Sequence, residues 1–164
     1  MIRTVSKWLL VGLVSSTMGM AHVQGAEGAK SNASAELLAI KADIKESLNQ
    51  GVHYLRHAQK DGKWLSHPGV TSLCLQAIFE CHRNYNEKDG PWTREPMEYL
   101  LSMQQDDGAF CDPKSRTPTK NYSTALAILA LKASGNPAYA ANIQRAQAFL
   151  VEIQCDEGEK YDAE

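Results

Sequence analysis

Apolar residues recur at every third or fourth position along most of the chain, which predicts helices with one apolar face. The first predicted helix starts near residue 36 and has an apolar face made of Leu37, Ile40, Ile44, Leu48, Val52 and Leu55. It should end near Gln59, because Lys60-Asp61-Gly62 is a turn sequence. Gly51 interrupts this helix at a tolerable cost of about 1 kcal/mol.

The same periodicity predicts four further helices, at residues 70–82, 94–105, 122–133 and 136–154. The helix at 122–133 is apolar on nearly every side, so we expect it to be buried on most sides. No segment alternates between apolar and polar residues as a half-buried strand would. The predicted fold class is therefore all-α, with about five helices.

Three stretches share one order: an aromatic residue and Leu, three further residues, Gln, a short acidic turn, Gly, and an aromatic residue. The shared positions are Gln59, Gly62 and Trp64 in copy 1, Gln104, Gly108 and Phe110 in copy 2, and Gln154, Gly158 and Tyr161 in copy 3. The Gln positions are 45 and then 50 residues apart, and one extra helix lies between successive copies. The repeat unit is therefore predicted to be a helix hairpin.

This repeat resembles the QW motif of the terpenoid cyclases (squalene-cyclase-like proteins) and the looser repeat of the protein prenyltransferase β subunits. Trp64 stands at the tryptophan position of that motif, Phe110 replaces it in copy 2, and Tyr161 comes one residue late in copy 3. The resemblance covers about residues 35–164 and implies an α/α toroid built from helix hairpins. Copy 3 also resembles an exported bacterial subgroup of these repeat proteins.

The repeated residues suit a structural role. A Gln at the end of one helix can bind backbone groups that lack partners at helix ends. Gly permits the turn that follows the helix, and the aromatic residue can cover the loop from water. The resemblance implies the same role, so these residues are expected to be structural clamps and the catalytic residues are unknown.

The N-terminus has the order of a secretory signal peptide. Arg3 and Lys7 precede an apolar run at 8–14, and small and polar residues follow as far as Ala26. We therefore predict a signal peptide at 1–26, a flexible leader at 27–35 and a partial toroid at 36–164. The protein is expected to be exported, to the periplasm or beyond, with no strong membrane signal apart from the signal peptide.

Charge and composition indicate which classes of partner the chain can be expected to bind. The net charge of -2 gives no reason to expect a nucleic-acid partner, and an apolar content of 43% is enough for a packed core. The four cysteines match no zinc pattern and are expected to be buried or free thiols. An apolar small molecule is the ligand that the resemblance suggests.

The sequence offers little catalytic chemistry. The Asp-x-Asp-Asp acid of the cyclases is absent, and Asp106-Asp107 and Asp156-Glu157 are expected to be exposed acidic turns. The prenyltransferase zinc set is also absent. His53 and His57 lie four residues apart, a spacing that can bind a metal, but we predict neither a metal nor a cofactor.

Five helices are few for a closed toroid, which needs about ten to twelve in proteins of this kind. We therefore expect a fragment, with an oligomer-closed solenoid and a marginal partial domain as alternatives; self-association is expected if the chain is complete. Two functions remain open. One is an exported, non-catalytic repeat protein that binds a ligand or partner. The other is the N-terminal part of a squalene- or hopene-type cyclase that acts on an apolar isoprenoid.

Overall fold

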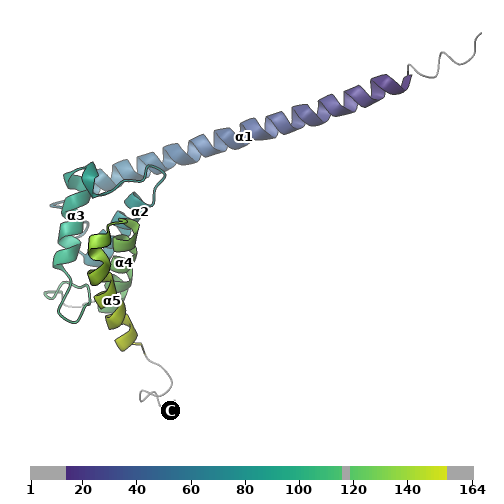
Figure 1. Cartoon of the computed structure of the whole chain (residues 1–164). Coiled ribbons are helices and arrows are strands. Elements are labelled where there is room, and N and C mark those ends of the chain that lie inside the picture. The colour runs from purple at the N-terminus through teal and green to yellow at the C-terminus, as the bar shows by residue number, and fades with distance from the viewer. Residues whose placement is uncertain (1–13, 116–118, 155–164) are drawn as a thin grey trace, which may run out of the picture. The chain divides into compact units, whose positions relative to one another are not determined.

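The computed structural model describes the backbone of residues 14–115 and 119–154, with side chains described from residue 33 onward (Figure 1). Over these ranges the chain forms five α-helices and no strand, which confirms the predicted all-α class. The α-helices are α1 (Val14–Ala58), α2 (Pro68–Phe79), α3 (Pro91–Ser102), α4 (Lys120–Ala133) and α5 (Ala140–Glu152). Short 3-10 turns, η1 (Glu87–Asp89) and η2 (Pro137–Tyr139), precede α3 and α5.

Prolines set the beginnings of α2 and α3, two to three residues earlier than predicted. Pro68 and Pro91 each stand at the first helical position, where the fixed φ suits a helix and the missing N–H costs nothing. The N–H groups of Gly69 and Val70 donate to His67 Nδ1, which caps α2. The turn predicted at 60–62 is confirmed, with Gly62 at φ +67°.

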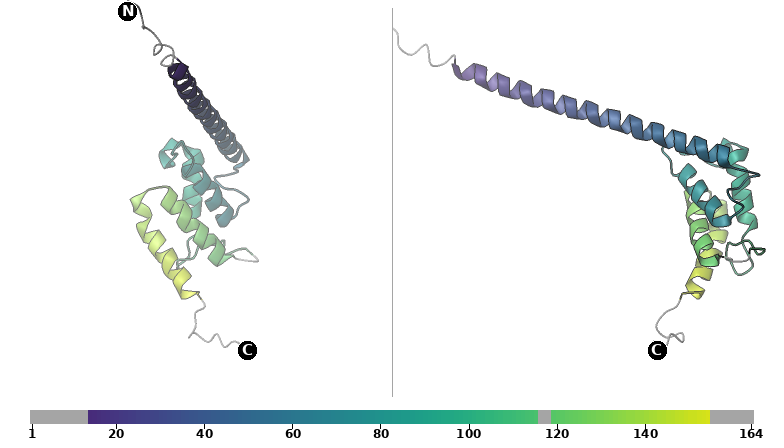
Figure 2. Two further views of the ribbon diagram at one scale, coloured as in Figure 1. Left: turned by 90° about the vertical axis from the view of Figure 1, so that its right-hand side faces the viewer. Right: turned by 180° about the vertical axis from the view of Figure 1, so that it is seen from behind.

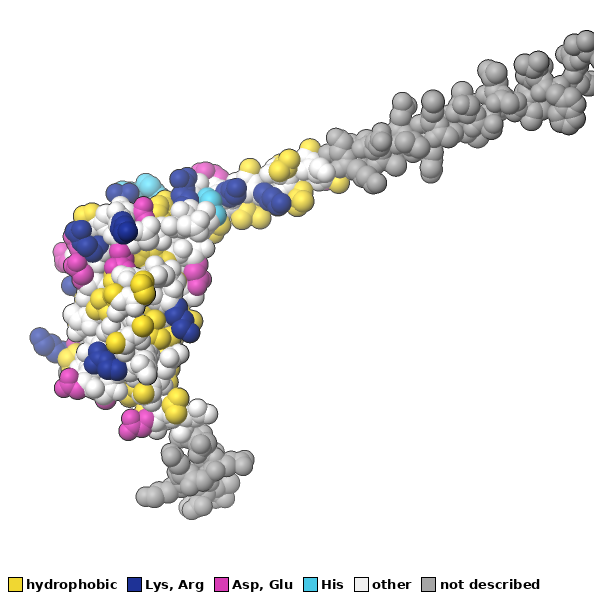
Figure 3. All heavy atoms as spheres, viewed as in Figure 1, with side chains coloured by type: hydrophobic (Ala, Val, Ile, Leu, Met, Phe, Trp, Pro, Cys, Tyr) yellow, Lys and Arg dark blue, Asp and Glu magenta, His cyan; other side chains and the backbone are white. Residues whose placement is uncertain are grey.

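The chain divides into two compact units, Met1–Ser47 and Leu48–Glu164. In the first unit, every side chain from residue 33 to 47 is exposed, including the apolar Leu37, Leu38, Ile40 and Ile44 (Figure 3). Residues 27–35, predicted as a flexible leader, are helical. They contain no proline, and five of the nine are strong helix formers, namely three Ala, one Glu and one Lys.

Part of the predicted signal peptide, residues 1–13, lies outside the described residues. The signal peptide therefore stays a prediction. In the described part of the chain, no helix has the length and apolar content required to span a membrane.

The second unit holds the core. Its helix α4 packs against α2 and α5, and α2 also packs against α3 (Figures 1 and 2). The largest buried aliphatic side chains are Leu75, Ile78, Met97, Leu100 and Leu131. Their removal from water is the main favourable contribution to folding.

The prediction that α4 is buried on most sides is only partly right. Its buried face holds Ala127, Ile128, Ala130 and Leu131, whereas Leu129 remains 44% exposed. Packing against two neighbours covers two faces of a helix and leaves the third open.

Candidate functional site: the repeat turns and their junctions

The turn of copy 1 contacts the helix of copy 2. The Gln59 side chain donates from Nε2 to the Trp92 carbonyl at 2.9 Å. That carbonyl belongs to the first turn of α3, and its normal helical donor would be the N–H of residue 96. Residue 96 is a proline inside the helix, so it has no N–H to offer. Gln59 therefore binds a backbone group that the helix itself leaves without a partner, as the sequence predicts for this residue.

The turn of copy 2 contacts the helix of copy 3 in the same way, with more bonds. Gln104 Nε2 donates to the Asn142 carbonyl at 2.9 Å and to the Gly108 carbonyl of its own turn at 3.2 Å. Its Oε1 accepts from Asn142 Nδ2 and from Arg145 Nη2, both at 2.6 Å. Both Nε2 and Oε1 of the Gln104 side chain are therefore hydrogen-bonded.

The two contacts between a repeat turn and the following helix, called junctions below, involve equivalent residues. Trp92 lies four residues before Pro96, and Asn142 lies four residues before Ala146, the residue that aligns with Pro96. The repeat glycines also approach the following helix at equivalent residues. A Cβ on Gly62 would lie 2.9 Å from Glu95 Cβ, and a Cβ on Gly108 would lie 2.4 Å from the Arg145 carbonyl oxygen.

Glu95 and Arg145 are also aligned positions, each directly before the small residue of its helix. Each turn therefore contacts the helix of the following copy at equivalent residues. Both glycines have positive φ, +67° and +90°, and both lie where a side chain would collide with that helix. Close approach and turn conformation together account for glycine at these positions.

The repeat aromatics of copies 1 and 2 are buried, which suits residues that cover the loop. Phe110 is fully buried and Trp64 nearly so. The Trp64 indole also donates to the Leu55 carbonyl at 2.9 Å, and this carbonyl lies in the last turn of α1, where helix carbonyls lack internal donors. Phe110 has no such donor.

A further pair of equivalent residues escaped the sequence analysis. The backbone N–H of Trp64 donates to Thr71 Oγ1 at 3.2 Å, and that of Phe110 donates to Thr124 Oγ1 at 2.8 Å. Both threonines are fully buried, in α2 and in α4. The segments Thr71–Ile78 and Thr124–Leu131 share Thr, Leu and Ala at matching positions, 53 residues apart. That spacing differs from 45 and 50, so a search at the Gln period does not find it.

Copy 3 ends the described chain. Gln154 follows α5 and is exposed, unlike the half-buried Gln59 and Gln104. Gly158 and Tyr161 lie outside the described residues, so their predicted roles stay predictions.

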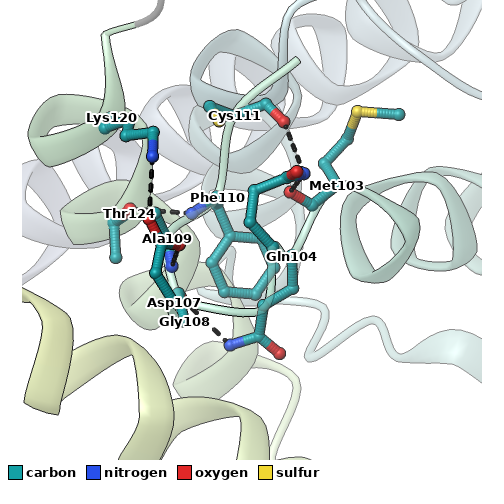
Figure 4. Close-up of polar contacts among 10 residues, drawn as sticks. Met103, Gln104, Asp107, Gly108, Ala109, Phe110, Cys111, Lys120 and Thr124 are labelled. Atoms are coloured by element: carbon teal, nitrogen blue, oxygen red, sulfur yellow. Dashed lines mark hydrogen bonds and ion pairs between the residues drawn. The ribbon is translucent and has the colours of Figure 1, made fainter. Parts of the chain in front are cut away.

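The acidic turn of copy 2 is exposed, in line with the sequence analysis. Asp107 accepts from the Ala109 N–H at 2.9 Å and pairs with Lys120 Nζ at 2.7 Å (Figure 4). The hydrogen bond from Lys120, with the one from Ala109, lowers the pKa of Asp107 below its usual 3.8. A general acid needs a raised pKa, so Asp107 is unsuited to that role.

The cysteines do not form a reactive centre in the described residues. Cys74, Cys81 and Cys111 are free thiols that are buried or half-buried, as expected. Burial raises the pKa of the Cys74 thiol to about 11 and also raises that of Cys111. Thiols with raised pKa values hold little nucleophilic thiolate at neutral pH.

Beside Trp92 lies an open groove whose lining combines aromatic and charged side chains. The guanidinium carbon of Arg56 lies 5.1 Å from the centre of the Trp92 ring. The Tyr85 ring meets the same ring edge-on, with 5.1 Å between the two ring centres. Arg83 Nε donates to Asn49 Oδ1 at 2.6 Å. The lining residues are Asn49, Val52, His53, Arg56, Arg83, Tyr85, Asp89 and Trp92.

His53 also approaches His57, with their Nε2 atoms 3.0 Å apart on the exposed side of α1. No group of three or more potential ligands among His, Cys, Asp and Glu gathers in the described part of the chain.

No protein-family model matches this chain. No solved structure matches it either.

Proposed function

We propose that this protein is an exported, non-catalytic helix-hairpin repeat protein, part of an α/α toroid of the squalene-cyclase and prenyltransferase-repeat kind. Its function is to present its surfaces to a ligand or partner. The observation that carries the proposal is the register of the two junctions, in which Gln59 and Gln104 bind equivalent carbonyls of the following helix. Repeats joined this way form extended binding surfaces.

The described residues of the motif make contacts that join the turns to the helices. Gln59, Gln104, Gly62 and Gly108 are engaged in turn-to-helix contacts, and the two buried aromatics cover the loops. The pKa of Asp107, in the acidic turn, is lowered chiefly by the hydrogen bond from Lys120. These roles support a binding scaffold over an enzyme.

The second candidate is the N-terminal part of a terpene cyclase. The observation that favours it is the motif itself, whose Trp64 copy is both buried and bonded to the end of α1. Its acid would have to come from a residue outside the repeat turns described above.

Incubation of the full chain with squalene, followed by gas chromatography of extracted lipids, separates the two candidates. A non-catalytic scaffold leaves squalene unchanged at every pH. Appearance of a cyclised product that depends on the protein would overturn the scaffold proposal and favour the cyclase.

Export needs a separate experiment. Expression of the full chain in a bacterium with two membranes should place it in the periplasmic fraction. N-terminal sequencing should then show removal of residues up to Ala21, Gly25 or Ala26. An unprocessed chain in the cytosol would contradict the export part of the proposal.

A further inference from the structure

The last two turns of α1 carry a pair of histidines on one side of the helix. His53 and His57 are four residues apart, and both side chains are exposed. Residues four apart on a helix are neighbours on its surface, one turn beyond the other. Spacing alone did not justify a metal prediction from the sequence, but the structure adds where the two rings lie.

The two rings turn the same nitrogen towards each other. Their Nε2 atoms lie 3.0 Å apart, with the ring centres 4.2 Å apart and the ring planes at 51°. An imidazole nitrogen binds Zn²⁺ at about 2.0–2.1 Å. With an angle of about 90–109° at the ion, two such bonds place the nitrogens about 2.9–3.4 Å apart. The observed separation therefore falls within the range that one ion bound to both rings requires.

We propose that His53 and His57 chelate one divalent transition-metal ion through their Nε2 atoms, of the kind that imidazole prefers: Zn²⁺, Cu²⁺ or Ni²⁺. Without the ion, the 3.0 Å contact is a hydrogen bond in which one ring carries its proton on Nε2. With the ion, both Nε2 lone pairs point at the metal and each neutral ring keeps its proton on Nδ1. One ring therefore changes tautomer, and the two rings release no proton.

The helix turn that carries the pair is held in place by other contacts. The Trp64 indole donates to the carbonyl of Leu55, which stands between the two histidines in the sequence. The side chains of Leu55 and Val52 pack against the core. Directly after the helix, Gln59 binds the Trp92 carbonyl. Because this helix end is already fixed, little of the binding free energy is lost to ordering it.

The charges around the pair act in opposite directions. Arg56 stands between the two histidines in the sequence, and its positive charge opposes a cation. The pair also lies near the C-terminal end of α1, which ends at Ala58, and this end of a helix favours cations. Because these two effects oppose each other, the two metal–nitrogen bonds decide the affinity.

The pair suits metal binding without catalysis. No group of three or more His, Cys, Asp or Glu residues gathers in the part of the chain that the structure describes. A four-coordinate ion held by two imidazoles keeps two positions for water or for a ligand from outside the chain. Catalytic zinc sites have three protein ligands. The site goes beyond the repeat function proposed above and does not depend on it.

Zinc binding to the full, untagged chain tests the site, measured by isothermal titration calorimetry with the thiols kept reduced. We expect one ion per chain at this pair. His53→Gln and His57→Gln each remove one ligand, and each should weaken binding at least about tenfold, since even the loss of an outer-shell partner has an effect of that size. His82→Gln is the matched control. It removes an exposed histidine from the loop after α2 and should bind zinc as the wild type does.

Nitrogen NMR of the imidazole rings identifies the atoms that bind. Zinc should shift the Nε2 resonances of His53 and His57 and leave those of His67 and His82 unchanged. His67 serves as an internal reference because its Nδ1 already caps α2. Zinc should also raise the Tm of the wild type more than that of either single variant, because the ion binds the folded pair.

Circular dichroism establishes that the variants remain folded, and Gln forms helices at least as well as His. A wild-type chain that binds no zinc would overturn the proposal. So would binding that survives either single change, which would place the ion on thiols or carboxylates, or Nε2 resonances that zinc does not move. None of these outcomes bears on the squalene and export experiments, which test the scaffold function separately.

Discussion

The two junctions reach the same register by different means. At the first, Gln59 makes one bond, to a carbonyl that Pro96 leaves unpaired, and Trp64 adds an indole bond to the end of α1. At the second, Gln104 makes four bonds, Gly108 lies closer to the next helix, and Phe110 contributes burial alone. The comparison shows that the motif fixes where the turn meets the helix, while the strength is distributed differently among its residues.

The largest expected difference between the junctions lies at the glycines. Gly108→Ala places a Cβ 2.4 Å from a backbone oxygen at φ +90°, so we expect a loss of about 3–5 kcal/mol in the free energy of unfolding. Gly62→Ala meets Glu95 Cβ at 2.9 Å and the Glu95 backbone carbon at 3.2 Å with φ +67°, a smaller overlap than at Gly108, and should cost about 2 kcal/mol. Urea unfolding of both variants measures this. Equal losses would show that the second junction is no tighter than the first.

The glutamines should differ next. Gln104→Ala removes four hydrogen bonds and should cost about 2 kcal/mol, whereas Gln59→Ala removes one and should cost about 1 kcal/mol. The loss at Gln59 persists because no helical N–H can replace it at the Trp92 carbonyl. Thermal unfolding of the two variants gives the order, and a larger effect at Gln59 would contradict the comparison.

The aromatic positions should differ less. Trp64→Phe removes the indole donor to the Leu55 carbonyl and should cost about 1 kcal/mol, beyond the small change in packing. Trp92→Phe is the matched control, because its indole bond to the Asp89 carbonyl is exposed and water can take it over. Chemical unfolding should show Trp64→Phe as the more damaging change. The opposite order would mean that the hydrogen bond from the Trp64 indole to the end of α1 does not stabilise the fold.

The smallest expected effect is the pH dependence of the Asp107–Lys120 pair at the second junction. The folded pKa of Asp107 is lowered, chiefly by the hydrogen bond from Lys120, so its contribution to stability is present above about pH 4 and lost as the pH falls through the folded pKa. Asp107→Asn should therefore lower the Tm slightly near neutral pH, with the difference shrinking in acid. A difference that grows in acid would refute this assignment.

Much of the fold could be predicted from the sequence because the apolar period is strong in every helix. The turn at Lys60-Asp61-Gly62 and the clamp role of Gln59 also follow from local chemistry that needs no tertiary context. The helix beginnings at Pro68 and Pro91 were predicted two to three residues late, because proline there starts a helix instead of preceding it.

The remaining differences have two sources. Helix α1 continues through residues 27–35, where small and polar residues predict a leader although five of the nine are Ala, Glu or Lys. The exposed Leu129 and the paired threonines Thr71 and Thr124 depend on which faces meet, and periodicity within one helix does not determine that. The partners of Gln104 on α5 likewise come from the junction and leave no local signal at Asn142 or Arg145.

The most direct test of the junction is a double-mutant cycle between Gln104 and Asn142, whose side chains lie 2.6 Å apart across it. Gln104→Ala, Asn142→Ala and the double variant are compared by urea unfolding, with Lys132→Ala in place of Asn142→Ala as the uncoupled reference. The described contacts predict a coupling of about 1 kcal/mol for Gln104 with Asn142 and none for the reference pair. Zero coupling between Gln104 and Asn142 would contradict the claim that the turn of one copy binds the helix of the next.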